Sequence, residues 1–264
     1  MRPFRPTLRF FARWALPWSL LTAACTPGFA APPGAAGPTP VAAPAESPPD
    51  PPSPPHPPAL PPIRDHLIPG TAEREALTEA YLQAHRTAPL SGNPEVDTRM
   101  VPRAIVLHWT AGPTAASAWA TFAPDHLAGR DDLRAGGDLN VGAHYVVDRD
   151  GTIERLFPDD RVVRHCIGLN HLAIGVENVG GDAAHPLTAA QVAADIALIR
   201  GLAARYPIEV LLGHLEYRRM EGSPLFEERD PAYRTTKPDP GAAFMASVRA
   251  GLTDLPLAEP PKGR

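Results

Sequence analysis

The stretch Ala104-Ile105-Val106-Leu107-His108-Trp109-Thr110 decides the fold of this 264-residue chain. Its first four residues are all apolar, with no alternation of polar side chains. Such a run is typical of a strand buried on both faces, in a sheet that helices cover on both sides. The run turns polar at His108 and Thr110 and is followed by Gly112. Polar groups at a strand end, next to a loop, are a common place for a functional site.

Segments of strand and helix character continue on both sides of this run. Further strands are expected at residues 143–148, 152–156, 172–178 and 208–212, and helices at residues 71–86, 117–122, 187–206 and 241–252. The turn Arg149-Asp150-Gly151 is expected to join the first two of these strands as a hairpin. Strands that alternate with helices predict the α/β class, here a single domain with a central mixed β-sheet flanked by helices.

Proline content predicts the limits of that domain. More than half of the 35 prolines lie before residue 70. A Pro-rich segment with few large apolar side chains cannot bury enough surface to offset the entropy lost on ordering. We therefore expect a disordered Pro-rich tether over residues 25–64, one folded domain over residues 65–255 and a flexible tail over residues 256–264.

The first residues, 1–24, predict export. Four arginines precede a mostly apolar stretch that ends in small residues, which is typical of a secretory signal peptide. The alternative is a short transmembrane anchor, but the stretch is shorter than the ~20 residues that a bilayer requires. Cleavage before Cys25, in a segment that resembles a lipoprotein box, would leave a lipidated protein, whereas cleavage after Ala30 would leave a soluble one. Cys25 closes the apolar stretch and precedes the tether, which favours the lipoprotein.

These features also predict location and partners. We expect a periplasmic protein, as an outer-membrane lipoprotein if anchored, whose contact with the membrane is the lipid on Cys25. The formal net charge is −4, without a run of Lys and Arg, which argues against nucleic acid as a partner. No self-association pattern is evident, which favours a monomer. Cys166 follows His165, but strand neighbours point to opposite faces, so a buried thiol is expected and not a thiol–imidazole pair.

Three residues with metal-binding side chains follow apolar segments. His108 and His214 stand at strand ends, and Asp239 lies in the stretch Lys237-Pro238-Asp239-Pro240-Gly241. Imidazole nitrogens and a carboxylate suit zinc, and three protein ligands leave a fourth position for water. Taken singly, each residue says little, because a lone histidine at a strand end is more often simply hydrogen-bonded.

Read together, seven segments resemble a known family. In chain order they are residues 106–110 (VLHWT), 143–145 (AHY), 148–152 (DRDGT), 164–165 (RH), 173–177 (AIGVE), 213–214 (GH) and 237–241 (KPDPG). They resemble the type 2 N-acetylmuramoyl-L-alanine amidases, whose fold the peptidoglycan recognition proteins share. The resemblance covers about residues 100 to 250.

The resemblance implies an activity and a role for each matching residue. His108, His214 and Asp239 would be zinc ligands, Glu177 the catalytic carboxylate and Lys237 its cationic partner. Glu177 would act as a general base, and Lys237 would stabilise the developing oxyanion. The reaction implied is zinc-dependent hydrolysis of the amide bond between N-acetylmuramic acid and L-alanine, in peptidoglycan or its fragments, during cell-wall turnover or remodelling.

The resemblance also implies substrate contacts and reveals two departures. Tyr145 and His165 match positions that line the family's cleft, so both are expected to contact substrate. The 24 residues between His214 and Asp239 form a longer segment than in compact members of the family. We call residues 216–236 the insert, and expect it to form a wall or lid over the cleft. The third ligand is Asp239 and not a cysteine, which places the chain nearer the bacterial amidases.

Three other functions compete with the amidase. Some members of this fold bind peptidoglycan without cutting it, usually after losing a zinc ligand, whereas this chain keeps the full set. A zinc peptidase is disfavoured because no His-Glu-x-x-His pattern is present. A purely structural lipoprotein would have no use for a metal-binding set. We therefore expect an enzyme, with a non-catalytic peptidoglycan-binding module as the alternative.

Overall fold

The computed structural model describes residues 59–261. The expected signal peptide, Cys25 and most of the expected tether lie outside the described residues. The regular elements, in chain order, are β1 (Ile63–Asp65), α1 (Ala72–His85), α2 (Pro94–Asp97), β2 (Ala104–Trp109), α3 (Ala115–Phe122), the 3-10 helix η1 (Asp131–Gly136), β3 (Tyr145–Val147), β4 (Ile153–Arg155), β5 (Ala173–Asn178), α4 (Ala189–Ala203), β6 (Val210–Gly213), the 3-10 helix η2 (His214–Met220) and α5 (Ala242–Ala250).

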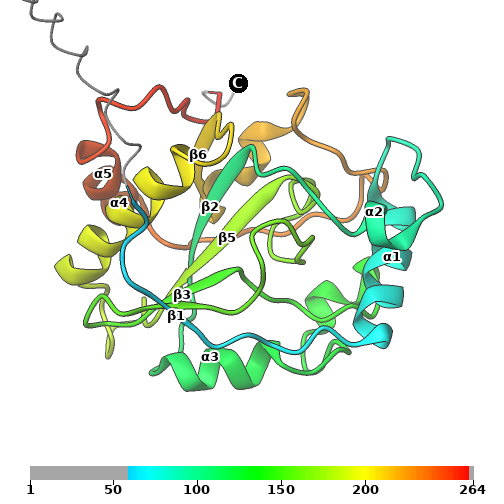
Figure 1. Ribbon diagram of the computed structural model, residues 1–264, viewed down its shortest axis with the longest axis horizontal. Coiled ribbons are helices and arrows are strands. Elements are labelled where there is room, and N and C mark those ends of the chain that lie inside the picture. Colours follow the sequence, from blue (N-terminus) through cyan, green and yellow to red (C-terminus); the bar gives the residue numbers. More distant parts are fainter. Residues whose placement is uncertain (1–58, 262–264) are drawn as a thin grey trace, which may run out of the picture. The chain divides into compact units, whose positions relative to one another are not determined.

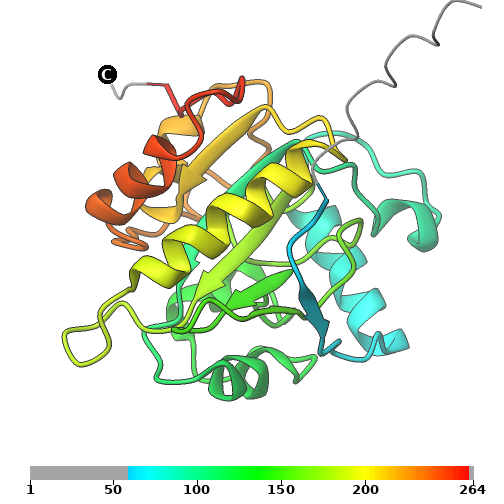
Figure 2. The ribbon, with the colours of Figure 1, turned by 60° about the vertical axis from the view of Figure 1, so that its left-hand side comes forward.

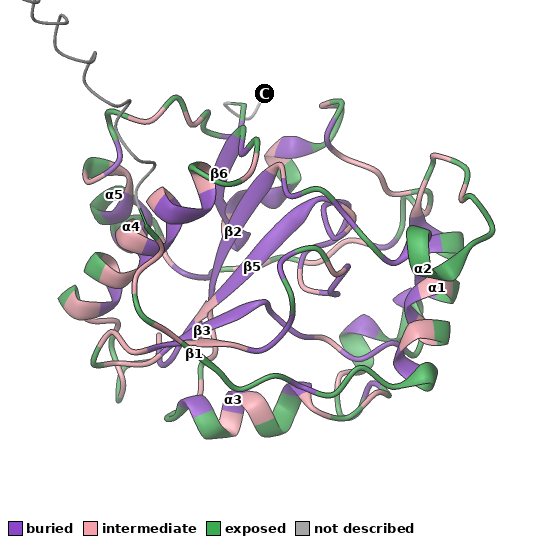
Figure 3. Cartoon of the chain, viewed as in Figure 1, coloured by how far each residue is buried: buried purple, intermediate pink, exposed green. Residues whose placement is uncertain are grey.

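The strands form one six-stranded mixed sheet, in the order β1-β4-β3-β5-β2-β6 (Figure 1). The β3–β4 hairpin is antiparallel, and the other neighbouring strands run parallel. The decisive strand β2 lies between β5 and β6, and all three are buried along most of their length (Figure 3). This arrangement confirms the predicted α/β class with a central mixed sheet flanked by helices.

The two faces of the sheet are covered by different helices. Alternate residues of β2, Ile105 and Leu107, pack with Leu198 and Ile199 of α4 in the largest core cluster, to which α5 also contributes. Figure 2 shows α4 lying along this face. On the other face, Val106 packs in a cluster with residues of α1 and of the insert, and α3 covers β3. Side chains of β2 and β5 that point to this second face therefore face the functional site described below.

Helix capping explains where the long helices begin. Thr71 accepts a hydrogen bond from the backbone N–H of Arg74 at the start of α1. Thr188 and Gln191 form a capping box at the start of α4, each side chain receiving the other residue's backbone N–H. Such caps satisfy donors that the first helical turn leaves free. Both helices lie within the ranges expected from the sequence.

The domain is longer at both ends than predicted. β1 begins at Ile63, inside the expected tether, and Leu60 packs directly on Gly201 of α4. At the other end, Ala258 donates its backbone N–H to Glu209 O at 2.8 Å, within the expected flexible tail. Both segments gain hydrogen bonds or apolar contacts with the sheet, which offset the entropy of ordering them. Among the described residues, no helix is long and apolar enough to cross a membrane.

Candidate active site

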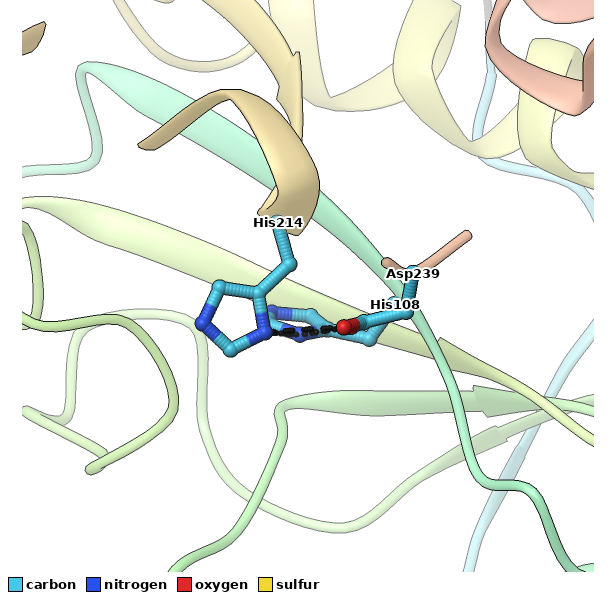
Figure 4. A group of neighbouring side chains, drawn as sticks. All are labelled: His108, His214 and Asp239. Carbon is cyan, nitrogen blue, oxygen red and sulfur yellow. Dashed lines mark hydrogen bonds and ion pairs between the residues drawn. The ribbon is translucent and has the colours of Figure 1, made fainter. Parts of the chain in front are cut away.

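Three candidate metal ligands meet at the carboxyl end of the central strands. His108 lies near the end of β2, His214 directly follows β6, and Asp239 lies in the loop before α5. The Nδ1 atoms of His108 and His214 are 2.9 Å apart, and Asp239 Oδ2 lies 3.2 Å and 3.0 Å from them, respectively. Figure 4 shows the two rings and the carboxylate converging on one point. Because β2 and β6 are parallel neighbours, their carboxyl ends bring the two histidines together.

The geometry and chemistry of these side chains suit a metal ion. Ligand atoms ~2.0–2.2 Å from a tetrahedral zinc lie ~3.3 Å from one another, close to the observed separations. Burial and nearby His108 lower the pKa of His214 to about 4, so this ring is neutral and keeps a lone pair at neutral pH. Burial would raise the pKa of Asp239, but its contacts with His108 and His214 outweigh burial and hold that pKa well below its usual value. The neutral imidazole of His214 and the carboxylate of Asp239 are therefore suited to bind a metal cation, and His108 offers a third ligand atom at the same point.

Glu177 lies beside the ligands because of strand register. Its Cα pairs with that of His108 across the parallel strands β2 and β5, so both side chains point to the same face. Burial raises the pKa of Glu177 to about 7. Its Oε2 is buried without a hydrogen-bond partner among the described residues. A buried carboxyl group of this kind beside a metal-binding set is suited to exchange a proton near neutral pH.

The site opens into a cavity of about 510 Å³. Its lining combines apolar and polar side chains with three cations, Arg130, Arg164 and Lys237. Burial, and then the charge of Arg130, lower the pKa of Lys237. Arg130 also forms a bidentate contact with Asp132, in which both distances are 2.9 Å. No sequence motif predicted the position of Arg130, because it lies in an irregular loop. The cavity therefore places positive charge close to the carboxyl groups of Glu177 and Asp239.

The insert forms one wall of this cavity, through Tyr233, Thr235 and Thr236. Arg164 donates a hydrogen bond from Nη2 to the hydroxyl oxygen of Tyr233 at 2.8 Å. Tyr233 rests against Gly136, where a Cβ atom would find no space. A second aromatic residue of the insert, Phe226, rests against Gly168 in the same way. The insert is therefore packed onto the domain by aromatic residues seated on glycines.

The two expected substrate contacts differ in outcome. Tyr145 is fully buried in the core cluster beneath α4, and its hydroxyl donates a hydrogen bond to Asp159, so the expected substrate contact is wrong for this residue. Its strand places it in register with Val176, on the face away from the cavity. His165 does line the cavity, and burial and nearby His108 lower its pKa well below the usual value. Cys166 is buried, as expected.

Comparisons with known proteins agree with this geometry. Residues 98–242, more than half of the chain, match the family described as N-acetylmuramoyl-L-alanine amidase. The endolysin of Escherichia phage T7 is 39% identical over 87 residues, which are 30% of this chain and 56% of the phage protein. The endolysin of Enterobacteria phage K11 is 36% identical over 83 residues, 30% of this chain and 55% of that protein. The chain thus spans about half the length of the curated relatives it matches.

Among solved structures, the endolysin N-acetylmuramoyl-L-alanine amidase LysCS from Clostridium intestinale URNW matches with a TM-score of 0.46. The match has 22% sequence identity and covers 74% of this chain and 98% of that one. The family match extends from residue 98, before β2, to residue 242, at the start of α5, so it includes all three candidate ligands and Glu177. The chain belongs to the N-acetylmuramoyl-L-alanine amidase family.

Proposed function

We propose that this protein is a zinc-dependent N-acetylmuramoyl-L-alanine amidase, which hydrolyses the amide bond between N-acetylmuramic acid and L-alanine in peptidoglycan or its fragments. The observation that carries the proposal is the convergence of His108, His214 and Asp239 beside the buried carboxyl oxygen of Glu177, in a chain of this family. A recognition protein that has no chemistry to perform would gain nothing from burying a carboxyl group beside three metal-binding side chains.

Zinc is the metal that best fits the donor set. His108, His214 and Asp239 would hold the ion through two nitrogens and one oxygen, and three protein ligands are the number that catalytic zinc sites typically use. A zinc ion held there would polarise the substrate carbonyl and lower the pKa of a coordinated water toward ~7.

Glu177 is the general base of the proposed reaction. Its carboxylate would accept a proton from the attacking water and then return it to the leaving amine of L-alanine. Burial is useful for this role, because a pKa of about 7 lets the same group accept and donate a proton near neutral pH.

Lys237 would stabilise the negative charge that develops on the carbonyl oxygen. It lies two residues before the ligand Asp239 and lines the same cavity. A cation that is already held in place, in a partly buried site, requires little reorganisation when that charge appears. Arg130 adds a second positive charge to this part of the cavity and would favour anionic groups of the substrate.

Where the protein acts follows from the sequence. We expect residues 1–24 to direct export to the periplasm and Cys25 to carry the lipid of an outer-membrane lipoprotein. Cell-wall material or its soluble turnover products would then be the substrate, with the monomer as the working form. Labelling of cells with a radioactive or clickable fatty acid, in the wild type and in a Cys25→Ala variant, tests the lipid anchor directly.

The amidase is tested by incubating the purified full-length protein with a muramoyl-peptide, with and without a zinc chelator, and following products by mass spectrometry. We expect release of a peptide with a free N-terminal alanine, loss of that release on chelation, and its recovery with added Zn²⁺. The alternative, a peptidoglycan-binding module, predicts an intact substrate that is retained by the protein. Release that survives thorough chelation would reject zinc dependence while keeping the amidase.

A further inference from the structure

His165 lies directly behind one of the candidate zinc ligands. Its Nδ1 is 3.1 Å from His108 Nε2, and its Nε2 is 2.9 Å from the backbone oxygen of Ala173. The rings of His108 and His165 meet edge to face, with centroids 5.2 Å apart. His165 therefore bridges a ligand on β2 and the first residue of β5.

The positions of the protons along this bridge follow from the groups that accept them. The Ala173 oxygen can only accept a hydrogen bond, so His165 Nε2 must carry the hydrogen. Nδ1 of a neutral His165 is then an acceptor, and His108 Nε2 must donate to it. His108 consequently keeps its lone pair on Nδ1, the atom that faces His214 and Asp239.

We propose that His165 is a positioning residue that fixes the tautomer and ring orientation of His108, so that Nδ1 of His108 is preset to bind zinc. The inference rests on the proposed function, because it takes zinc as the ion at this site. Groups that receive the second N–H of a metal-binding histidine typically contribute 10- to 100-fold to metal affinity.

This role is different from substrate contact. Both ring nitrogens of His165 already have partners within the protein, so neither is free to hydrogen-bond a bound muramoyl-peptide. The ring contributes a surface to the cavity, but its hydrogen-bonding capacity is used to hold His108.

A glycine of the sheet leaves room for the ring of His165. Gly175 of β5 lies under His165, and a Cβ atom there would be 2.8 Å from His165 Cγ and 2.9 Å from Nδ1. Contacts that short are not tolerated, so an alanine at 175 would push the ring away from His108. Gly175→Ala thus disturbs the bridge without removing any polar group.

The test compares four variants of the full-length protein, one of which is Gly175→Ala. His165→Leu removes the acceptor, and His165→Gln replaces it with an amide that can accept from His108 and donate to Ala173. His144→Gln is the matched control. His144 is also buried and also bonded at both nitrogens, 2.9 Å from Arg161 O and 3.0 Å from Gly175 N, but it contacts no candidate ligand.

Zinc affinity is measured by competition with a chromophoric chelator. We expect His165→Leu and Gly175→Ala to weaken zinc binding ~10- to 100-fold, and His165→Gln to weaken it only a few-fold. His144→Gln is expected to lower the thermal midpoint without changing zinc affinity. An unchanged zinc affinity in His165→Leu would overturn the proposal.

Nitrogen NMR of the metal-free protein gives a second readout, independent of activity. In the wild type the hydrogen of His108 is expected on Nε2. In His165→Leu it should move to Nδ1, where Asp239 Oδ2 at 3.2 Å can accept it. A wild-type protein with its hydrogen on Nδ1 of His108 would also reject the bridge. If wild type binds zinc and shows no amidase activity, the proposed function fails while the role of His165 can still stand.

Discussion

Glu177 and Asp195 carry buried carboxyl groups that lie on opposite sides of β5. Glu177 faces the cavity, whereas Asp195 lies in α4 and accepts a hydrogen bond at 3.0 Å from Asn178, the next residue of β5. Burial raises the pKa of each to about 7. A raised pKa alone therefore does not mark a catalytic group, and the surroundings decide.

The surroundings of the two carboxyl groups differ in access and in charge. Glu177 has Lys237 and Arg130 within electrostatic range and opens to a space that can hold substrate. Asp195 is completely buried, and its charged form is favoured by the hydrogen bond from Asn178. The first carboxyl group can exchange protons with a bound molecule, whereas the second can only change the stability of the fold.

The largest expected effect is on the cavity face. Glu177→Gln should lower kcat for a muramoyl-peptide by ~10²- to 10⁴-fold, because the proposed general base is lost while the shape of the side chain is kept. The matched change away from the cavity is Asp195→Asn. It should leave kcat within about threefold of wild type, since its effect is confined to stability. Steady-state kinetics at pH 7 checks both. Equal losses of kcat in the two variants would show that the two carboxyl groups do not differ in function.

The next effect concerns the cation in the cavity. Lys237→Met should lower kcat ~10²- to 10³-fold, because the cation proposed to stabilise the oxyanion is removed. Arg134→Met is the control: Arg134 belongs to η1 and its side chain is 62% exposed, paired with Asp131. A Lys237→Met enzyme with normal kcat and a raised KM would make Lys237 a binding residue and not a catalytic one.

Asp195 should make the free energy of unfolding depend on pH. The pKa of an unfolded aspartate is ~3.9, below the value of about 7 for Asp195 in the fold, so the folded protein binds the extra proton. The free energy of unfolding should therefore fall as pH rises from about 4 to about 7 and level off above. Asp195→Asn should remove on the order of 2 kcal/mol of that fall, measured by urea denaturation of metal-free protein at pH 5 and pH 8. An identical slope in both proteins would show that Asp195 does not titrate there.

The smallest expected effect concerns Tyr145, which lies away from the cavity. Tyr145→Phe should cost ~1 kcal/mol of stability through the lost hydrogen bond to Asp159. Asp159 keeps the hydroxyl of Tyr206 at 3.0 Å, which limits the cost. KM for a muramoyl-peptide should not change, because Tyr145 lies on the α4 side of the sheet. A several-fold rise in KM would restore the substrate contact that the sequence suggested.

The central strands and the convergence of the three candidate ligands were predictable because they depend on local patterns and on motif order. The apolar run that ends at His108 fixes a buried strand, and parallel neighbours must deliver their ends to one edge. The orientation of Tyr145 was missed because a three-residue strand has too little alternation to reveal its buried face. β1 was missed for a related reason, since its pairing with β4 joins Ile63 to Ile153, far away in sequence.

The position of Arg130 could not be predicted from sequence motifs. It belongs to no matching segment and lies in an irregular loop, so only the folded chain brings it to the cavity beside Lys237. The start of the domain was predicted too late, because proline content alone does not reveal the packing of Leu60 against Gly201 and the core.

The aromatic residues of the insert have an evolutionary consequence. Tyr233 and Phe226 occupy the space that side chains at Gly136 and Gly168 would take. A lineage that lost the insert would uncover two gaps, and mutations that filled them would prevent the insert from returning in its present position. Among relatives, the length of the segment between the second histidine ligand and the aspartate ligand should therefore covary with glycine at the position of Gly136. Gly168 should vary less, because its φ of +80° independently favours glycine.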